Sequence, residues 1–248
     1  MLEGCEAISH SAGSDVGVLV IHGFTGSPFS VRGVADAMTS AGFDVEAPRL
    51  PGHGTTVEDM LDTRWDDWGA EVAAAHDRLA ARCRRVVVAG QSLGATLALW
   101  TALRRGDVAG VVCINPLVVP RAADELALID ELLADGLAIV PGGGSDIADP
   151  DGFDISYDGT PLAPIRSALV DGVATLAPRL GELDVALRLF TSRQDHVVDP
   201  SNSDHLAAVW AGPVEHTWLE RSYHVATRDL DRDILEQGAA DFVREVAA

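Results

Sequence analysis

The chain has 248 residues, of which 47% are hydrophobic, enough for one large domain with a substantial core. Its formal net charge is −20 and it contains no lysine, a composition typical of a GC-rich genome or of a salt-adapted host. This charge disfavours nucleic acid and anionic membranes as partners, because phosphate binding needs clustered positive charge. No apolar stretch reaches the roughly 18 residues of a transmembrane helix, so we expect no stable membrane insertion.

Apolar runs and helical patterns alternate along the chain, after an acidic start that lacks the form of a signal peptide. The predicted strands are 16–21, 43–47, 86–89, 109–114, 185–191 and 214–219, and the predicted helices are 31–41, 65–83, 93–104, 203–210 and 231–246. This alternation is typical of a mostly parallel sheet flanked by helices. We therefore predict an α/β fold. The acidic first residues favour a cytoplasmic protein. The three widely spaced cysteines argue against a disulfide framework or a zinc site.

The segment 118–162 interrupts the alternation. It contains a helical pattern over 124–133, then Gly142-Gly143-Gly144, then an Asp-rich stretch to Asp158. Three consecutive glycines do not belong in regular structure. We therefore predict a cap at 118–162, inserted over the end of the sheet between core segments 1–117 and 163–248, with the glycines as a flexible joint. The alternative is a surface excursion without a role over the site.

The pentapeptide Gly90-Gln91-Ser92-Leu93-Gly94 lies between a predicted strand and a predicted helix. A strand, a tight turn with a central serine and a helix are the context of a nucleophile elbow. The two glycines leave room for a turn in which a larger side chain would clash. We predict that Ser92 is a catalytic nucleophile. The alternative is an ordinary Gly/Ser turn of an α/β domain.

A serine hydroxyl needs a base, and after an elbow serine the order is an acid and then a histidine. Four histidines follow Ser92: His196, His205, His216 and His224. His205 and His216 lie inside a predicted helix and a predicted strand. His224 follows the last predicted strand, where the base belongs, so we predict that it is the base.

Asp195 and Asp199 both follow the strand 185–191, where the acid is expected. Asp199 precedes a proline and is a candidate start of the next helix. We therefore favour Asp195 as the residue that fixes the imidazole tautomer and stabilises the imidazolium, with His196 as its loop neighbour.

An oxyanion hole needs two backbone N–H groups. We predict that Leu93, after the nucleophile, and Phe24, in the glycine-rich loop after the first long strand, supply them. His22 and His53, which lie in turns next to glycines, are predicted to be structural, and His22 is expected to support the loop by hydrogen bonding.

Several motifs, in order along the chain, carry a resemblance: 22–26, 48–55, 90–94, 195–198 and 222–227. With them the chain resembles the α/β-hydrolase superfamily, and within it the bacterial monoacylglycerol lipase and small carboxylesterase family. The resemblance implies an α/β-hydrolase fold, a Ser92-Asp195-His224 triad and an oxyanion hole of Phe24 and Leu93.

The resemblance also implies a glycerol-binding acid shortly before a Tyr-x-x-Thr-Pro segment. Tyr157-Asp158-Gly159-Thr160-Pro161 matches that segment and places the acid at Asp154. The family has a glutamate there, which is longer by one methylene. The alternative for Asp154 is one more solvated acid of this Asp-rich stretch.

The implied function is the hydrolysis of a monoacylglycerol, a small-molecule lipid ester, to glycerol and fatty acid through an acyl-enzyme, with no metal or cofactor. The acyl chain is expected in an apolar groove under the cap, with four candidate lining residues: Leu126, Ile129, Leu132 and Ile139. The alternative for these four residues is a role in the hydrophobic core. The alternatives are a broad short-chain carboxylesterase, an acyltransferase and a non-catalytic binding protein on the same fold.

Overall fold

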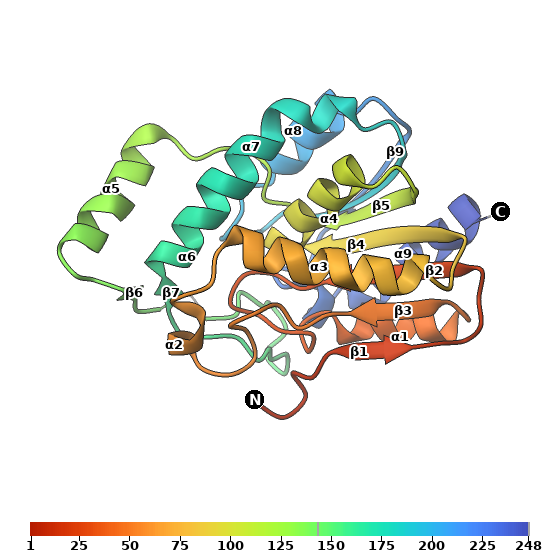
Figure 1. The fold of residues 1–248 in the computed structure, drawn as a ribbon, viewed down its shortest axis with the longest axis horizontal. Coiled ribbons are helices and arrows are strands. Elements are labelled where there is room, and N and C mark those ends of the chain that lie inside the picture. The colour runs from red at the N-terminus through yellow and green to blue at the C-terminus, as the bar shows by residue number, and fades with distance from the viewer. Residues whose placement is uncertain (143, 248) are drawn as a thin grey trace.

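A seven-stranded sheet forms the centre of the computed structural model, which describes residues 1–142 and 144–247 (Figure 1). Its strands are β1 (Ile8–His10), β2 (Val16–Ile21), β3 (Asp44–Ala47), β4 (Arg85–Gln91), β5 (Val108–Ile114), β8 (Ala186–Ser192) and β9 (Val214–Leu219). Their order in the sheet is β1-β3-β2-β4-β5-β8-β9. β1 runs antiparallel to β3, and the other neighbouring pairs of this sheet are parallel. The predicted mostly parallel sheet is confirmed.

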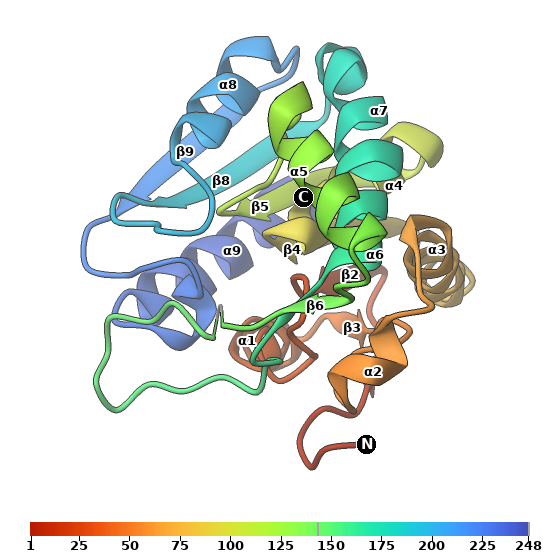
Figure 2. The same ribbon diagram turned by 90° about the vertical axis from the view of Figure 1, so that its left-hand side faces the viewer.

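Helices cover both faces of the sheet. They are α1 (Arg32–Ser40), α2 (Val57–Met60), α3 (Trp65–Ala80), α4 (Leu93–Arg104), α5 (Ala123–Ala134), α6 (Leu162–Ser167), α7 (Ala174–Leu176), α8 (Ser201–Val209) and α9 (Arg232–Ala247). Figures 1 and 2 show α1 and α9 on one face, and α3, α4 and α8 on the other. Each face has its own hydrophobic core. In β2, Val18 faces one core and Leu19 the other, as the two-residue period of a strand requires.

The segment between β5 and β8 extends beyond the carboxyl ends of the parallel strands (Figures 1 and 2). It contains α5 and a short antiparallel pair, β6 (Ile139–Val140) with β7 (Thr160–Pro161). After α6, the chain stays helical through a π-helical turn, η1 (Ala168–Val173), then α7, then a 3₁₀ helix, η2 (Ala177–Glu182). The sequence did not predict this helical stretch, because its prolines and glycines interrupt the apolar pattern.

The helix predicted at 124–133 is confirmed as α5. Of the predicted joint Gly142–Gly144, the central Gly143 lies outside the described residues. Among the described helices, none combines the length and the apolar character that a membrane crossing requires. A further 3₁₀ turn, η3 (Ala226–Arg228), lies between β9 and α9, close to the site.

Candidate active site

Ser92 lies in a one-residue turn between β4 and α4. Its φ of 55° and ψ of −121° place a non-glycine residue in a sparsely populated conformation, which the surrounding structure must hold in place. A Cβ on Gly90 would overlap with the carbonyl of Gly94, and a Cβ on Gly94 would overlap with the carbonyl of Ile21. The two glycines of the pentapeptide are therefore required by the close packing of β4, α4 and β2.

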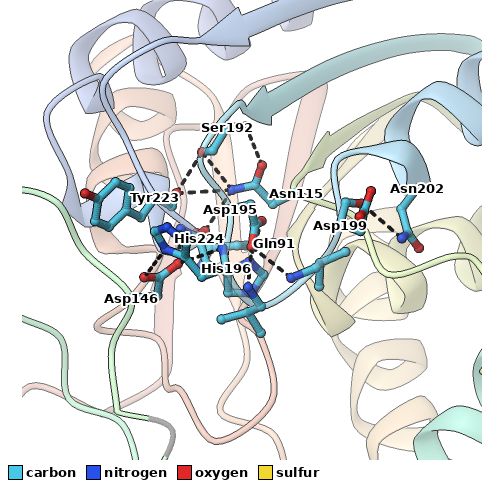
Figure 3. A network of polar contacts seen from close by, with 12 residues as sticks. Gln91, Asn115, Asp146, Ser192, Asp195, His196, Asp199, Asn202, Tyr223 and His224 are labelled. Atoms are coloured by element: carbon cyan, nitrogen blue, oxygen red, sulfur yellow. Dashed lines mark hydrogen bonds and ion pairs between the residues drawn. The ribbon is translucent and has the colours of Figure 1, made fainter. Parts of the chain in front are cut away.

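Asp195 and His224 are hydrogen bonded to each other. His224 Nδ1 lies 2.7 Å from Asp195 Oδ2, and both side chains are almost fully buried (Figure 3). The other carboxylate oxygen accepts the backbone N–H groups of Val197 and Val198, each at 2.8 Å. Because a carboxylate only accepts hydrogen bonds, Nδ1 is the donor, and Nε2 of the neutral ring is left to accept a proton. Ser92 and His224 line the same pocket.

The other candidates for acid and base have different partners. Asp199 Oδ1 accepts the backbone N–H of Ser201 at 2.8 Å, at the start of α8. His196 Nδ1 lies 2.9 Å from Asp146 Oδ1, and His216 Nε2 lies 2.8 Å from Thr191 Oγ1. A fourth candidate, on the exposed side of α8, is His205. Within the described residues, these three histidines lie outside the lining of the Ser92 pocket.

The loop after β2 packs against Ser92. Phe24 and Leu93 line the pocket, and a Cβ added to Gly23 would lie 3.3 Å from Ser92 Cβ. In the hydrogen bonds of residues 1–142 and 144–247, the N–H groups of Phe24 and Leu93 have no protein acceptor. Both N–H groups are therefore available to a ligand in the pocket, and their role as an oxyanion hole stays a prediction.

A buried neutral histidine supports this loop. His22 Nε2 accepts the N–H of Leu50 at 3.2 Å, so its Nδ1 is the donor to the carbonyl of Gly23 at 2.9 Å. Burial, together with neighbouring His53, lowers the pKa of His22 well below its usual value, and burial lowers the pKa of His53 to about 4. The expected hydrogen-bonding role of His22 is confirmed.

The pocket has a volume of about 340 Å³. Its apolar lining comes from Leu117, Ile165, Leu169, Val197, Val198 and Val225, together with Phe24 and Leu93. Of the two alternatives for the four candidate groove residues, the lining role is not the one observed, because the pocket that the described residues form is lined by none of Leu126, Ile129, Leu132 and Ile139. Leu126 and Ile129 of α5 instead pack against the apolar cluster that includes Leu117 and Leu169. Of the helices in this segment, α6 and η1 contribute Ile165 and Leu169 to the pocket lining, and α5 packs against these two elements.

Asp154 also lines the pocket. Ser30 Oγ donates to its carboxylate and lies 2.8 Å from Oδ1 and 2.9 Å from Oδ2. Burial raises the pKa of the Asp154 carboxyl, and the Ser30 hydrogen bonds oppose that effect. Tyr157 donates to the carbonyl of Gly52 at 2.6 Å and accepts the N–H of Thr55 at 3.0 Å. Two of the motifs predicted from the sequence, 48–55 and 157–161, are thus hydrogen bonded to each other.

Sequence reasoning missed two residues that hold the His224 backbone, Asn115 and Asp146. Asn115, directly after β5, has a φ of 45°, and its Nδ2 donates to the carbonyl of His224 at 2.8 Å. Its Oδ1 accepts the N–H of Ser192 at 2.7 Å. From the other side, Asp146 Oδ2 accepts the N–H of His224 at 3.1 Å. An asparagine directly after a strand, where it tolerates positive φ, could have indicated Asn115, whereas no local pattern distinguishes Asp146 from its acidic neighbours.

The geometry thus joins a strained serine, a buried Asp–His pair and two free backbone donors at the carboxyl edge of a parallel sheet. A family model described as the alpha/beta hydrolase family matches residues 18–246. The chain belongs to the alpha/beta hydrolase family. The predicted α/β-hydrolase fold with a mostly parallel sheet is therefore confirmed, as is the resemblance stated from the motifs.

Two curated relatives of this alpha/beta hydrolase are similar over nearly its whole length. The thermostable monoacylglycerol lipase of Bacillus sp. (strain H-257) is 36% identical over 246 residues, which cover 98% of this chain and 95% of that protein. A carboxylesterase of Bacillus subtilis (strain 168) is 24% identical over 237 residues, which cover 94% of each.

Two solved structures are also similar to this chain over nearly its whole length. A structure from work on the metagenome-derived lipolytic enzymes LipS and LipT matches with a TM-score of 0.91 at 36% identity, covering 98% of this chain and 99% of that one. The Paleococcus ferrophilus monoacylglycerol lipase matches with a TM-score of 0.75 at 15% identity, covering 93% and 94%, and at that identity it supports the fold alone.

Proposed function

We propose that this alpha/beta hydrolase is a serine esterase that hydrolyses monoacylglycerols. The observation that carries the proposal is one pocket that combines Ser92 and His224 with apolar side chains and with the Asp154–Ser30 pair. A monoacylglycerol has the matching parts, which are a scissile ester, an apolar chain and a polyol. The 36% identity to a monoacylglycerol lipase over 98% of the chain supports the same substrate class.

The reaction follows from the hydrogen bonds around His224. Ser92 Oγ attacks the acyl carbonyl carbon while His224 Nε2 takes the hydroxyl proton, and Asp195 stabilises the imidazolium. The N–H groups of Phe24 and Leu93 stabilise the oxyanion of the tetrahedral intermediate. The bond to the glycerol oxygen then breaks as His224 returns its proton to that oxygen. Water, deprotonated by His224, then attacks the acyl carbon of the acyl-enzyme. The bond from that carbon to Ser92 Oγ breaks as His224 returns the proton to Oγ, and the fatty acid is released.

The pocket has apolar and polar lining residues, which match the acyl chain and the glycerol end of the substrate. We propose that the acyl chain packs against Leu117, Ile165 and Leu169. These are the apolar side chains that the segment between β5 and β8 contributes to the pocket lining. We propose that Asp154 accepts a hydrogen bond from a glycerol hydroxyl. Its carboxylate is partly desolvated, and a hydroxyl donor would stabilise the ionised form in the way that Ser30 does.

Residues 118–162 are proposed to form the cap. The support is the position of α5, β6 and β7 beyond the carboxyl ends of the strands, together with the pocket residues contributed by this segment, among them Arg121, Asp146 and Asp154. A cytoplasmic location and the absence of nucleic-acid partners stay predictions.

A broad short-chain carboxylesterase is the second candidate, because the Bacillus subtilis carboxylesterase is also similar over 94% of the chain. The two are separated by kcat/KM for 1-monolaurin and for p-nitrophenyl butyrate, with Ser92→Ala as the background control. We expect efficient hydrolysis of 1-monolaurin that Ser92→Ala abolishes. A strong preference for the butyrate ester would support the carboxylesterase instead, and full activity in Ser92→Ala would refute both.

A further inference from the structure

A stretch of chain between β6 and β7, residues 144–158, crosses the site and is called the strap below. It forms hydrogen bonds with several loops at the carboxyl edge of the sheet. The N–H groups of Ala148 and Asp149 each donate to the Asp229 carboxylate at 2.9 Å. Asp154 accepts from Ser30, and the N–H of Tyr157 donates to the carbonyl of Thr25 at 3.2 Å. The strap is thus bonded both to the segment after His224 and to the oxyanion loop.

Asp146 is the strap residue that contacts the loops of both the acid and the base (Figure 3). Its Oδ2 accepts the N–H of His196, the residue after Asp195, at 3.2 Å, and the N–H of His224 at 3.1 Å. Its Oδ1 lies 2.9 Å from His196 Nδ1, and its carbonyl accepts the N–H of Val225 at 3.0 Å. One side chain, 17% exposed, therefore receives one backbone donor from His224 and one from the residue after Asp195.

The opposite side of His224 is held by the sheet. Asn115 Nδ2 donates to the His224 carbonyl at 2.8 Å, and Ser192 Oγ donates to the carbonyl of Tyr223 at 2.7 Å. Each peptide group beside the His224 Cα is therefore held from two sides: the one before it by Ser192 and the Asp146 carboxylate, the one after it by Asn115 and the Asp146 carbonyl. Removing the Asp146 carboxylate leaves the imidazole with its Asp195 bond but frees the N–H of His224 and the N–H of the residue after Asp195.

We infer that Asp146 is a positioning residue, whose carboxylate holds the Asp195 and His224 loops at the separation that proton transfer from Ser92 requires. The inference rests on the proposed function. It makes catalysis depend on a docked strap, because the residues that react lie in the core whereas Asp146 lies in the proposed cap. A misplacement of about 1 Å in such a constellation costs on the order of 10²-fold in rate.

An amide can replace this carboxylate in part. In Asp146→Asn, the amide oxygen can accept the same two backbone N–H groups, and the NH₂ group can donate to His196 Nδ1 in its other tautomer. Asp146→Ala removes all of these acceptors. Asp149→Ala is the matched control, because Asp149 lies in the same strap and its carboxylate pairs with Arg232, away from the Asp–His pair.

The experiment compares kcat and KM on p-nitrophenyl butyrate and on 1-monolaurin for the wild type and these three variants, with a thermal melt of each. We expect Asp146→Ala to lower kcat about 10- to 100-fold on both esters, with KM within about twofold, Asp146→Asn to recover most of the loss, and Asp149→Ala to match the wild type. Wild-type kcat in Asp146→Ala, or equal losses in Asp146→Asn and Asp146→Ala, would overturn the inference.

A Ser92→Ala control distinguishes a failure of the proposed function from a failure of the role inferred for Asp146. If Ser92→Ala keeps wild-type activity, the proposed function itself fails. If Ser92→Ala is inactive while Asp146→Ala keeps its kcat, the proposed function stands and the role of Asp146 is refuted.

Discussion

The Oγ of Thr227 lies 2.6 Å from Oε1 of Gln91, and both side chains are buried. Gln91 is the residue before the nucleophile, and Thr227 comes three residues after His224 in η3. The same hydroxyl also lies 2.6 Å from the carbonyl of Ser30, on the loop that carries the Asp154 partner. One small side chain therefore links the elbow, the base loop and the polar end of the pocket.

Replacing Thr227 by valine tests this link. The valine has nearly the same shape but leaves Gln91 Oε1 buried without its donor, so we expect the free energy of unfolding to fall by about 1–3 kcal/mol. Thr227→Ser keeps the hydroxyl and is expected to recover most of that loss. Urea unfolding of the three proteins measures both values, and equal stabilities of the valine and serine variants would contradict the assignment.

Asp195→Asn tests the buried acid. An amide in place of the Asp195 carboxylate favours the wrong imidazole tautomer, so we expect kcat to drop by about 10³- to 10⁴-fold on p-nitrophenyl butyrate. Asp199→Asn is the matched control in the same loop, because Asp199 accepts the N–H of Ser201 at the start of α8 and lies outside the pocket lining of the described residues. Its kcat is expected to stay within about twofold of the wild type. Similar losses in both variants would show that the acid has been misassigned.

Gly94→Ala tests the packing of the elbow. The added methyl overlaps with backbone carbonyls of Ile21 and His22, which cannot move without displacing β2, so we expect a loss of at least about 3 kcal/mol in stability and no measurable esterase activity. Gly106→Ala is the control, since a Cβ there meets no atom within 4 Å. Thermal unfolding compares the two. A stable, active Gly94→Ala protein would be incompatible with this elbow.

Stability should fall in mild acid because of His53. Burial lowers its pKa to about 4 in the folded protein, whereas the unfolded chain has a value near 6.5. Between these values the unfolded state binds more protons, so the stabilisation is complete above pH 6.5 and is lost as the pH falls toward 4, by about 3 kcal/mol in total. Unfolding at pH 7 and pH 5 should show a smaller pH effect in His53→Gln than in the wild type. An unchanged pH effect would contradict the burial of a neutral imidazole.

Asp154→Ala tests the polyol end of the pocket. We expect it to lower kcat/KM for 1-monolaurin about tenfold, the cost of one lost charge-assisted hydrogen bond, while p-nitrophenyl butyrate hydrolysis is unchanged. Asp158→Ala removes an exposed carboxylate four residues later and should alter neither substrate. Equal losses on both esters in Asp154→Ala would remove its role in glycerol recognition.

The predicted core follows from strong local signals. The β2 and β4 runs are apolar on both faces, as strands buried between two helical layers must be, and the pentapeptide around Ser92 joins a strand to a helix without a gap. A proline after an acid also predicts a helix start, and Asp199 does accept an N–H at the start of α8, whereas Asp195 contacts His224. The role of Asp195 as the acid stays a prediction.

The segment between β5 and β8 was less predictable for a physical reason. The apolar positions of α5 correctly indicated a helix, but amphipathicity does not say which layer a helix packs on. In the structure α6 and η1 lie between α5 and the pocket, so Ile165 and Leu169 provide the lining. The role inferred for Asp146 depends on tertiary contacts 50 and 78 residues away along the chain, which no local pattern encodes.

The positive φ of Ser92 ends β4 and begins α4 within a single residue, so the N–H of Leu93 is the first peptide group of a 12-residue helix. The aligned peptide dipoles of that helix concentrate partial positive charge at its N-terminus. A negative charge developing on a substrate at Ser92 would therefore be stabilised by the first turn of α4 as well as by two hydrogen bonds. This part of the stabilisation belongs to the backbone, and no side-chain substitution that preserves the helix would remove it.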